Sequence, residues 1–279
     1  MTSGGSGRRR GGPRRGKPKG KPKGGGRARG RGRRGSGGVG GERIEGRHAV
    51  REALVAGTRP VREVVLADDL ERSDLVADIL ELAKSSGVPV RRVPRRYLDA
   101  EARTEAPQGV MAVADPLPEA ELDGLVATDR PFLLALDGVT DPGNLGALLR
   151  TADAAGVTGI VLPRHRAAHV TAAVTKAAAG AAEHVPIAVV PGMPAALQHL
   201  KEAGLWVVGL DEAGDRPLFG VDVVDGPVVV VLGAEGRGLG RLVRERCDVL
   251  VRIPLRGHLP SLNVSVAGAL ACFEVARRR

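Results

Sequence analysis

Short apolar runs alternate with segments of helical periodicity through the second half of the chain, from Pro131 to the end. Runs that are apolar along their whole length are typical of strands in a parallel sheet that helices cover on both faces. The pattern therefore predicts an α/β domain over residues 131–279. Its strands are expected at residues 132–136, 159–162, 187–190, 205–210, 228–232 and 249–253.

The last element of this domain is expected to be a helix over residues 262–277. Val266, Leu270 and Phe273 recur in it at helical spacing, so we predict that they contact the core. The small residues Ala267, Gly268 and Ala271 would let another backbone approach this helix closely.

A smaller set of elements precedes this domain, in residues 43–115. Helices are expected at residues 42–56, with Ile44, Val50 and Leu54 as apolar anchors, around 75–82, and at 95–103. Strands are expected at residues 61–67, 88–93 and 109–114. Residues 115–129 contain two prolines and five acidic residues, so we place a linker at residues 116–130. The pattern thus predicts a small α/β domain followed by a larger one.

The first 41 residues lack such patterning. They contain 14 Lys and Arg, 17 Gly, no acidic residue and no Leu, Ile or Phe. Because they cannot bury enough apolar surface to offset the entropy of ordering, we predict a disordered tail. Its charge suits binding to nucleic acid phosphates, and the alternative is a solubilising leader. The rest of the chain has 28 basic and 32 acidic residues, so the net charge of +10 resides in the tail.

The rest of the sequence indicates where the protein resides and whether it binds a metal. No apolar stretch is long enough for a signal peptide or a membrane span, so we expect a cytoplasmic protein without a membrane partner. Cys247 and Cys272 lack metal-binding or redox spacing and are expected to be reduced, buried thiols. The six histidines form no metal-ligand motif, so no metal is expected.

Three polar, glycine-rich segments contain the candidate chemistry, each directly after an apolar run. They are residues 137–150 (DGVTDPGNLGALLR), 231–240 (VLGAEGRGLG) and 253–268 (IPLRGHLPSLNVSVAG). α/β proteins build ligand sites at such positions. In the first segment, Asn144 is expected to cap a helix. Arg150 lies beside apolar positions and is either a snorkelling surface residue or a clamp for a phosphate or carboxylate.

The other two segments are expected to be ligand-binding loops. Glycines from Gly233 onward let the backbone approach a ligand, although neither common nucleotide fingerprint fits their spacing. Glu235 is either an ordinary loop acid or a catalytic one. In the third segment, Ser261 is expected to cap the last helix and Asn263 to be a solvated residue of its first turn. Leu262 would be exposed unless a flat apolar group such as a nucleobase covers it.

Taken together, the three segments resemble, in order and spacing, the motifs of the SpoU (TrmH) family of RNA ribose 2′-O-methyltransferases, within the SPOUT superfamily. Residues 43–115 are similar to the small L30e-like RNA-binding domain of that family, whereas the Arg/Gly tail departs from it. The resemblance implies a parallel sheet with a deep trefoil knot in residues 131–279, and S-adenosylmethionine as cofactor. It places the cofactor contacts at Leu210, Gly233, Ile253 and Leu262.

The resemblance also implies a catalytic set, namely Asn144, Arg150, Glu235, Ser261 and Asn263. Arg150 matches the family arginine proposed to act on the 2′-hydroxyl. Since a guanidinium has a pKa above about 12, we favour phosphate anchoring and polarisation of the hydroxyl as its role. The family builds its site at a homodimer interface, where Arg150 would serve the partner's cofactor. The implied substrate is a guanosine of 23S rRNA. The alternatives are the same reaction on tRNA, or a non-catalytic RNA-binding relative.

Overall fold

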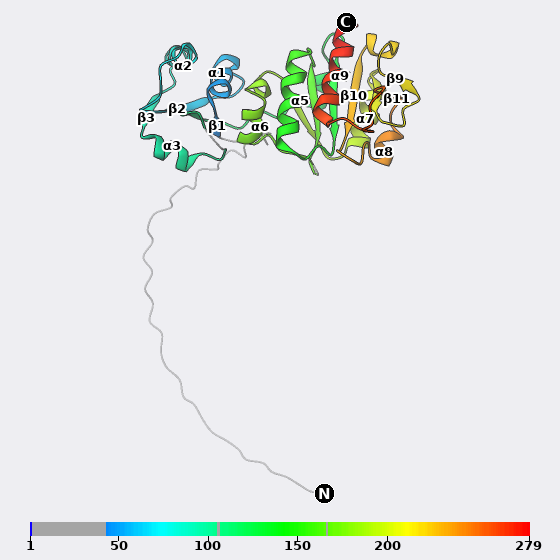
Figure 1. Ribbon diagram of the computed structural model, residues 1–279, viewed down its shortest axis with the longest axis horizontal. Coiled ribbons are helices and arrows are strands. Elements are labelled where there is room, and N and C mark those ends of the chain that lie inside the picture. The colour runs from blue at the N-terminus through cyan, green and yellow to red at the C-terminus, as the bar shows by residue number, and fades with distance from the viewer. Residues whose placement is uncertain (2–42, 105–106, 166) are drawn as a thin grey trace, which may run out of the picture. The chain divides into compact units, whose positions relative to one another are not determined.

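The computed structural model describes Met1 and residues 43–104, 107–165 and 167–279. The prediction of a disordered tail falls outside these residues. From Arg43 onward, the described residues belong to one compact unit, Gly35–Arg279, which contains two sheets (Figure 1). In this part of the chain, no helix is long and apolar enough to cross a membrane.

The first sheet has four strands in the order β1-β4-β2-β3, where only β2 and β3 run parallel. Its core is one cluster of apolar side chains that includes Ile44, Val50 and Leu54, the three predicted anchors. The elements are β1 (Arg43–Glu45), α1 (Arg47–Ala56), β2 (Val61–Ala67), α2 (Asp74–Ser85), β3 (Val90–Val93), α3 (Arg95–Glu101) and β4 (Val110–Ala114).

The helix predicted at residues 42–56 is wrong at its start. Arg43–Glu45 form strand β1, which pairs antiparallel with β4 so that Ile44 lies opposite Ala112. Gly46 then turns the chain into α1 with φ of 98°, a conformation that favours glycine. Val50 and Leu54 have helical spacing, and the apolar Ile44 just before them was assigned to the same helix, so the pattern did not separate a three-residue strand from the helix that follows.

The second sheet has seven strands in the order β7-β6-β5-β10-β8-β11-β9, and every neighbouring pair is parallel. Apolar clusters cover both faces, as the uninterrupted apolar runs predicted. The strands are β5 (Phe132–Asp137), β6 (Gly159–Pro163), β7 (Ile187–Val190), β8 (Trp206–Leu210), β9 (Arg216–Pro217), β10 (Val228–Gly233) and β11 (Val249–Arg252). The short strand β9 carries no apolar run and was not predicted.

Helices and 3₁₀ turns connect these strands. They are α4 (Leu122–Val126), α5 (Pro142–Ala154), α6 (Ala172–Ala177), η1 (Ala181–Glu183), α7 (Met193–Glu202), η2 (Asp222–Asp225), α8 (Arg241–Arg244) and α9 (Val264–Arg277). Helix α4 lies within the predicted linker, and its Leu125 packs into the core on one face of the large sheet. This contact ties residues 116–130 to the second sheet.

Helix α9 presents a different face to the core from the one predicted. Val266, Leu270 and Phe273 are 48%, 37% and 50% exposed, whereas Ala271 and Cys272 are buried. The reason is close packing on α5 and β10. A Cβ atom at Gly268 would lie 2.4 Å from Leu148 Cδ2 and 2.7 Å from Leu232 Cδ1. The predicted close approach at Gly268 is therefore confirmed, and the larger side chains of α9 point away from the sheet.

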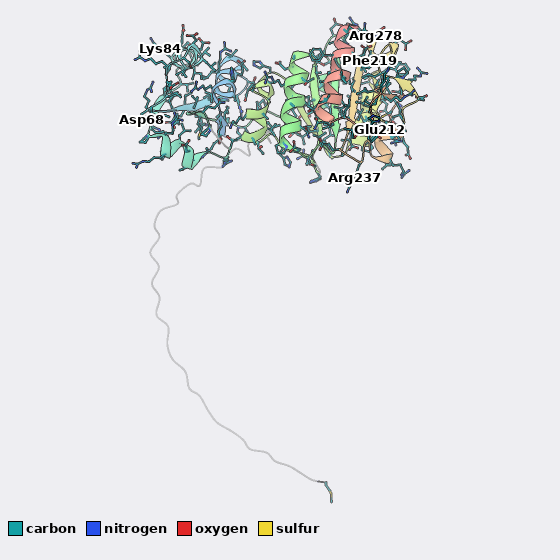
Figure 2. All side chains as sticks on the ribbon, in the orientation of Figure 1. Asp68, Lys84, Glu212, Phe219, Arg237 and Arg278 are labelled. Carbon is teal, nitrogen blue, oxygen red and sulfur yellow. The ribbon has the colours of Figure 1, made fainter. Side chains whose placement is uncertain are left out.

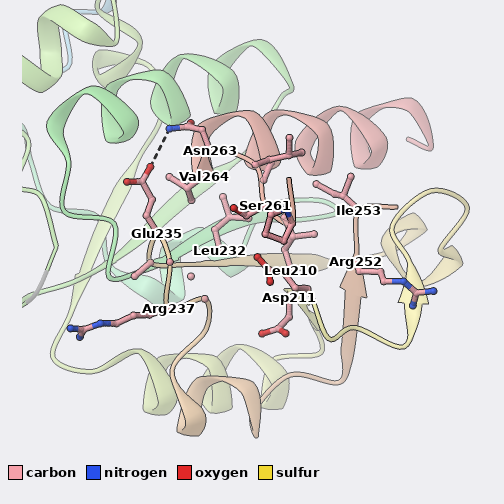
Figure 3. Close-up of a pocket in the computed structure, with 18 of the residues that line it drawn as sticks. Leu210, Asp211, Leu232, Glu235, Arg237, Arg252, Ile253, Ser261, Asn263 and Val264 are labelled. Atoms are coloured by element: carbon pink, nitrogen blue, oxygen red, sulfur yellow. Dashed lines mark hydrogen bonds between the residues drawn. The ribbon is translucent and has the colours of Figure 1, made fainter. Parts of the chain in front are cut away.

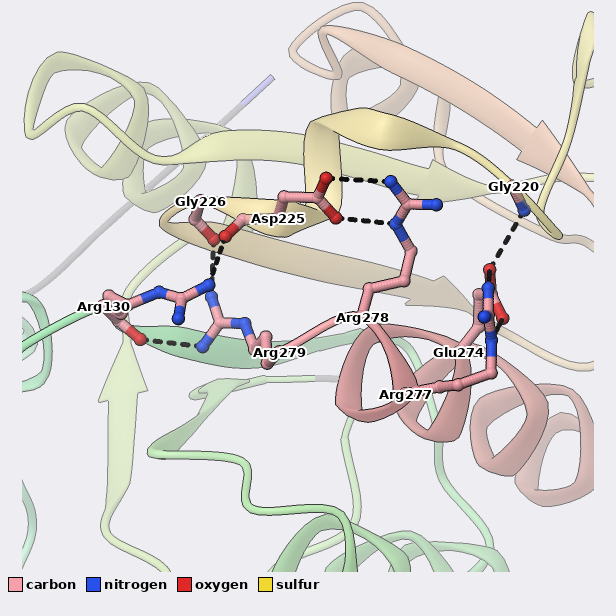
Figure 4. A network of polar contacts seen from close by, with 8 residues as sticks. All are labelled: Arg130, Gly220, Asp225, Gly226, Glu274, Arg277, Arg278 and Arg279. Atoms are coloured by element: carbon pink, nitrogen blue, oxygen red, sulfur yellow. Dashed lines mark hydrogen bonds and ion pairs between the residues drawn. The ribbon is translucent and has the colours of Figure 1, made fainter.

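The C-terminal end of α9 is held across the starts of β5 and β10 by arginines (Figure 4). Arg278 pairs with both carboxylate oxygens of Asp225, at 2.6 and 2.8 Å. Arg279 donates to the carbonyls of Arg130, Pro131 and Gly226. These contacts fix the end of α9 that lies opposite the carboxyl edge of the sheet.

A buried ion pair joins the segment before β2 to η1. Arg59 Nη2 lies 2.5 Å from Glu183 Oε1, Arg59 Nε donates to Oε2 at 3.1 Å, and both side chains are at most 1% exposed. Thr58 Oγ1 also donates to the Glu183 carbonyl at 2.7 Å. Two charges buried together need such complete pairing, because desolvation of an unpaired charge is costly.

Candidate functional site

The carboxyl ends of β8, β10 and β11 open onto a cavity of about 750 Å³ (Figure 3). Its lining comes from the loops that follow these three strands and from the start of α9. All four predicted cofactor residues, Leu210, Gly233, Ile253 and Leu262, line it. Leu262 is 40% exposed, so the described residues leave much of this apolar side chain uncovered.

The loop after β10 is a tight hairpin. Ala234 and Gly238 exchange two backbone hydrogen bonds, at 3.0 and 2.9 Å. A Cβ atom at Gly233 would lie 2.1 Å from the carbonyl carbon of Gly238, so only glycine fits there. Asp137 Oδ2 accepts a hydrogen bond from Gly240 N at 3.1 Å and fixes the end of the loop to β5. Gly233 is therefore needed for the loop to close. It also leaves the backbone accessible to a ligand.

Asn144, Glu235 and Asn263 form one hydrogen-bonded group at the edge of the cavity. Glu235 Oε1 accepts from Asn144 Nδ2 at 2.6 Å and from Asn263 Nδ2 at 3.1 Å, the second of which is drawn in Figure 3. Asn263 Nδ2 also donates to Asn144 Oδ1 at 3.0 Å. One residue from each of the three polar segments thus meets at a single point.

Two predicted helix caps are wrong. Helix α5 is capped by Asp141, whose Oδ1 accepts from Asn144 N at 2.7 Å. Pro142 takes the first helical position, which suits its fixed φ, so the cap falls one residue before it. This frees the Asn144 side chain to reach Glu235.

Helix α9 is capped by Asn263 and not by Ser261. Asn263 Oδ1 accepts from Ser265 N at 2.9 Å, and the helix begins at Val264. Because that oxygen faces the helix, the amide nitrogen must face Glu235, so the cap also orients the group at the cavity edge. Ser261 lies in the loop before α9, where it lines the cavity.

Arg150 does not reach the cavity of its own chain. It lies on α5 with an exposed side chain, and it makes no hydrogen bond or ion pair with any residue that the structure describes. It is also absent from the cavity lining. Its guanidinium is therefore free to act on a group outside this chain.

Five charged residues of the cavity were not predicted, namely Asp211, Glu212, Arg237, Arg244 and Arg252. Asp211, whose side chain is 4% exposed, accepts from Arg244 Nη2 and Ala213 N, at 2.6 and 2.9 Å. Arg252 Nη1 donates to the Gly214 carbonyl at 2.6 Å. Arg237 lies at the tip of the hairpin. The signal for Asp211 was its place directly after an apolar strand, whereas the arginines had no sequence signal.

The charged groups just described offer no metal centre. Among the residues that the structure describes, no group of three or more His, Cys, Asp and Glu side chains is arranged to hold a metal ion.

Comparison with known proteins assigns the chain to a family. Residues 131–273 match the SpoU rRNA methylase family, and residues 43–120 match the RNA 2′-O ribose methyltransferase substrate-binding family. The chain is 44% identical over 240 residues to the 23S rRNA (guanosine-2′-O-)-methyltransferase RlmB of Shewanella oneidensis, covering 85% of this chain and 97% of the relative. It is 41% identical to the putative TrmH family tRNA/rRNA methyltransferase YacO of Bacillus subtilis, with 85% and 95% covered.

Its fold agrees with these matches. The crystal structure of the SpoU methyltransferase AviRb from Streptomyces viridochromogenes, in complex with the cofactor AdoMet, superposes with a TM-score of 0.71 at 26% identity, covering 85% of this chain and 89% of that one. An α/β fold with a parallel sheet and three motif segments around one cavity defines a methyltransferase of the SpoU type. The chain belongs to the SpoU rRNA methylase family.

Proposed function

We propose that the protein transfers a methyl group from S-adenosylmethionine to the ribose 2′-hydroxyl of a guanosine in 23S rRNA. Methyl transfer to RNA is the chemistry of its family, and the Shewanella relative is named for this substrate. The observation that carries the proposal is the group formed by Asn144, Glu235 and Asn263 at the edge of the cavity. A protein that only bound RNA would not need three distant segments to converge there, which argues against a non-catalytic relative.

The cavity suits S-adenosylmethionine in size and lining. About 750 Å³ falls within the usual range for small-molecule sites. Leu210, Ile253 and Leu262 offer apolar contact to an adenine, and the loop backbones offer polar groups for its edge. When bound, the cofactor supplies the methyl group as an electrophile on a sulfonium.

The polar group would orient the acceptor ribose. Glu235 Oε1 is taken up by two amides, whereas Oε2 has no hydrogen bond within the described residues. That oxygen can accept a hydrogen bond from a ribose hydroxyl and hold it in line with the methyl group. Asn144 and Asn263 hold the Glu235 carboxylate in place before the substrate binds. The carboxylate therefore loses little conformational freedom when the reaction takes place.

Arg150 would complete the site from a second copy of the chain. It is exposed and does not line its own cavity, and α9 presents an exposed apolar stripe of Val266, Leu270 and Phe273. An unpaired apolar stripe of this kind is typical of an interface. A homodimer that buried the stripe would bring a partner helix α5 towards Leu262, and with it a guanidinium to anchor phosphate and polarise the 2′-hydroxyl.

The path of the chain suggests that the cavity lies within a trefoil knot. Strand β11 adds to the sheet beyond β8, yet α9, which follows it, packs on α5 and β10. The chain must therefore cross back past the loops after β8 and β10. If the segment between β11 and α9 passes through the loops after β8 and β10, the knot itself would hold these three loops against one another.

The small domain, residues 43–115, would bind the RNA through an L30e-like fold, joined by the linker at residues 116–130 to the methyltransferase domain, 131–279. Tyr97 is 48% exposed, and Arg91 stacks over its ring at 5.6 Å from the centroid. Exposed aromatic rings beside arginine suit stacking with unpaired bases. The Arg/Gly-rich segment, residues 1–41, would add a sequence-independent attraction. An rRNA substrate would place the enzyme in the cytoplasm.

The test is methyl transfer in vitro from radiolabelled S-adenosylmethionine to unmodified rRNA and tRNA transcripts. We expect label in 23S rRNA, and mapping of 2′-O-methyl marks should assign it to one guanosine. The Bacillus relative is named for tRNA or rRNA, so tRNA is the second candidate. Label in tRNA alone would establish that alternative, and binding without transfer to either RNA would overturn both.

A further inference from the structure

Three arginines line the cavity, and two of them are held by the protein. Arg244 pairs with the buried carboxylate of Asp211, and Arg252 donates to the Gly214 carbonyl. Arg237 differs from both, because its side chain has no hydrogen bond or ion pair with any described residue. Among the cavity arginines, it alone has a guanidinium with no donor used by a described residue, whereas exposed Arg252 donates to one carbonyl and pairs with no described acid.

The hairpin holds Arg237 at its tip by backbone geometry. The neighbouring glycines, Gly236 and Gly238, have φ of 72° and 63°, and the Ala234–Gly238 bridge closes the turn around them. Glu235, the nearest acid in the hairpin, already accepts from Asn144 and Asn263 and forms no ion pair with Arg237. The loop thus fixes the backbone of Arg237 at the tip, while the charge of its side chain stays uncompensated.

Figure 3 shows where this side chain points. Arg237 extends away from Leu210 and Ile253, on the Glu235 side of the cavity, whereas Arg252 lies on the opposite side. In Figure 2 it reaches the outer margin of the domain, far from Arg278 at the other end of the sheet. The guanidinium therefore points outward on the side of the cavity that carries Glu235.

We propose that Arg237 binds a backbone phosphate of the RNA strand beside the acceptor nucleotide. The inference rests on the proposed function, since it needs a ribose held at Glu235. A ribose placed there has a phosphate on each side, and a planar guanidinium with five donors can bind phosphate oxygens in pairs. The cofactor's own carboxylate is the competing ligand, and the direction of the side chain, out of the cavity, favours the strand outside.

The test compares Arg237→Ala and Arg237→Lys with Arg246→Ala as the matched control. Arg246 is also an exposed arginine of this domain without a side-chain partner among the described residues, but it does not line the cavity. The dissociation constants for an unmodified 23S rRNA transcript and for S-adenosylmethionine are measured separately by titration, the former across a range of salt concentrations. The melting temperature of each variant checks folding.

We expect Arg237→Ala to weaken RNA binding about tenfold, as loss of a hydrogen bond to a charged group does. Its salt dependence should fall by about one phosphate contact. Arg237→Lys should recover part of the affinity, and Arg246→Ala should behave as the wild type. Affinity for S-adenosylmethionine should not change in any of them.

Two results would overturn the inference. Loss of cofactor affinity with unchanged RNA affinity would assign Arg237 to the cofactor carboxylate, and unchanged affinity for both would remove it from the site. Neither result depends on turnover. Absence of methyl transfer by the wild type would count against the proposed function, while the RNA titrations would still decide the role of Arg237.

Discussion

Asn263 Nδ2 donates a hydrogen bond of 3.0 Å to Asn144 Oδ1, although the two residues are 119 positions apart. The same nitrogen reaches Glu235, and the other end of the amide caps α9. One side chain therefore connects the start of a helix to a carboxylate at the cavity edge. Substitution of Asn263 can separate its role as the cap of α9 from its role in holding Glu235.

Asn263→Asp should lose methyl transfer but keep stability. An aspartate still accepts from Ser265 N and caps the helix, yet its second oxygen would face Glu235 as a like charge. We expect the rate at saturating substrates to fall at least about tenfold, because the carboxylate loses its fixed position. Asn263→Ala should lose activity and, in addition, about 1 kcal/mol of stability with the cap. Single-turnover rates and urea unfolding measure the two effects. Wild-type activity in Asn263→Asp would show that the group plays no part in the reaction.

Arg150→Ala should abolish methyl transfer and leave S-adenosylmethionine binding intact, since Arg150 lies outside its own cavity. Equal loss of both would contradict the assigned role.

A heterodimer gives a sharper test of the same role. One chain carries Arg150→Ala and the other Glu235→Gln, and two different tags isolate the mixed pair. If Arg150 serves the partner's cavity, one of the two symmetric sites is intact and about half of the wild-type activity returns. If it serves its own chain, the heterodimer is inactive.

Glu183→Gln should destabilise the protein strongly. It removes the carboxylate that Arg59 faces in a buried setting, where both side chains are at most 1% exposed. Breaking one side of such a pair costs about 3–5 kcal/mol. Urea unfolding measures the loss, and Glu245→Gln is the control, since its partner Arg241 is 79% exposed. Equal midpoints for the two variants would mean that burial of the pair contributes nothing.

Stability should decline above about pH 9, and Cys272 should contribute to the decline together with Cys247, whose pKa burial also raises. Burial raises the pKa of the Cys272 thiol to about 12, whereas an unfolded cysteine ionises near 8.5. The folded state disfavours the thiolate, so the stability is complete below the unfolded pKa and is lost as pH rises from there towards 12. The loss should approach about 1.4 kcal/mol for each pH unit. Urea unfolding at pH 8 and pH 10 measures it, and Cys272→Ala should reduce the difference. An equal decline in both proteins would exclude a contribution from Cys272.

Deletion of residues 1–41 should weaken RNA binding mainly at low salt. The segment carries 14 positive charges, and neutralised phosphates release counterions, which makes the affinity depend on salt. The slope of log affinity against log salt concentration should become shallower in the truncated protein. An unchanged slope would leave the segment as a solubilising leader only.

The sequence by itself determined the layers of the fold and the three polar segments that supply Asn144, Glu235 and Asn263. Apolar runs such as 228–232 mark burial on both faces, which only a covered parallel sheet satisfies, so strand identity could be predicted locally. Strand ends of one sheet share an edge, so the three polar segments could be expected to meet there.

Tertiary structure alone decided how these parts face one another. Helix α9 is apolar on both Val266–Leu270–Phe273 and Gly268–Ala271–Cys272, so its periodicity fits two orientations, and the fit of Gly268 against Leu148 selects one. Asn144 and Ser261 were each plausible caps, but Asp141 and Asn263 take those positions. Asn144, Glu235 and Asn263 come together through contacts between residues up to 119 positions apart in the sequence. Local propensities act over a few residues, so they cannot specify these contacts.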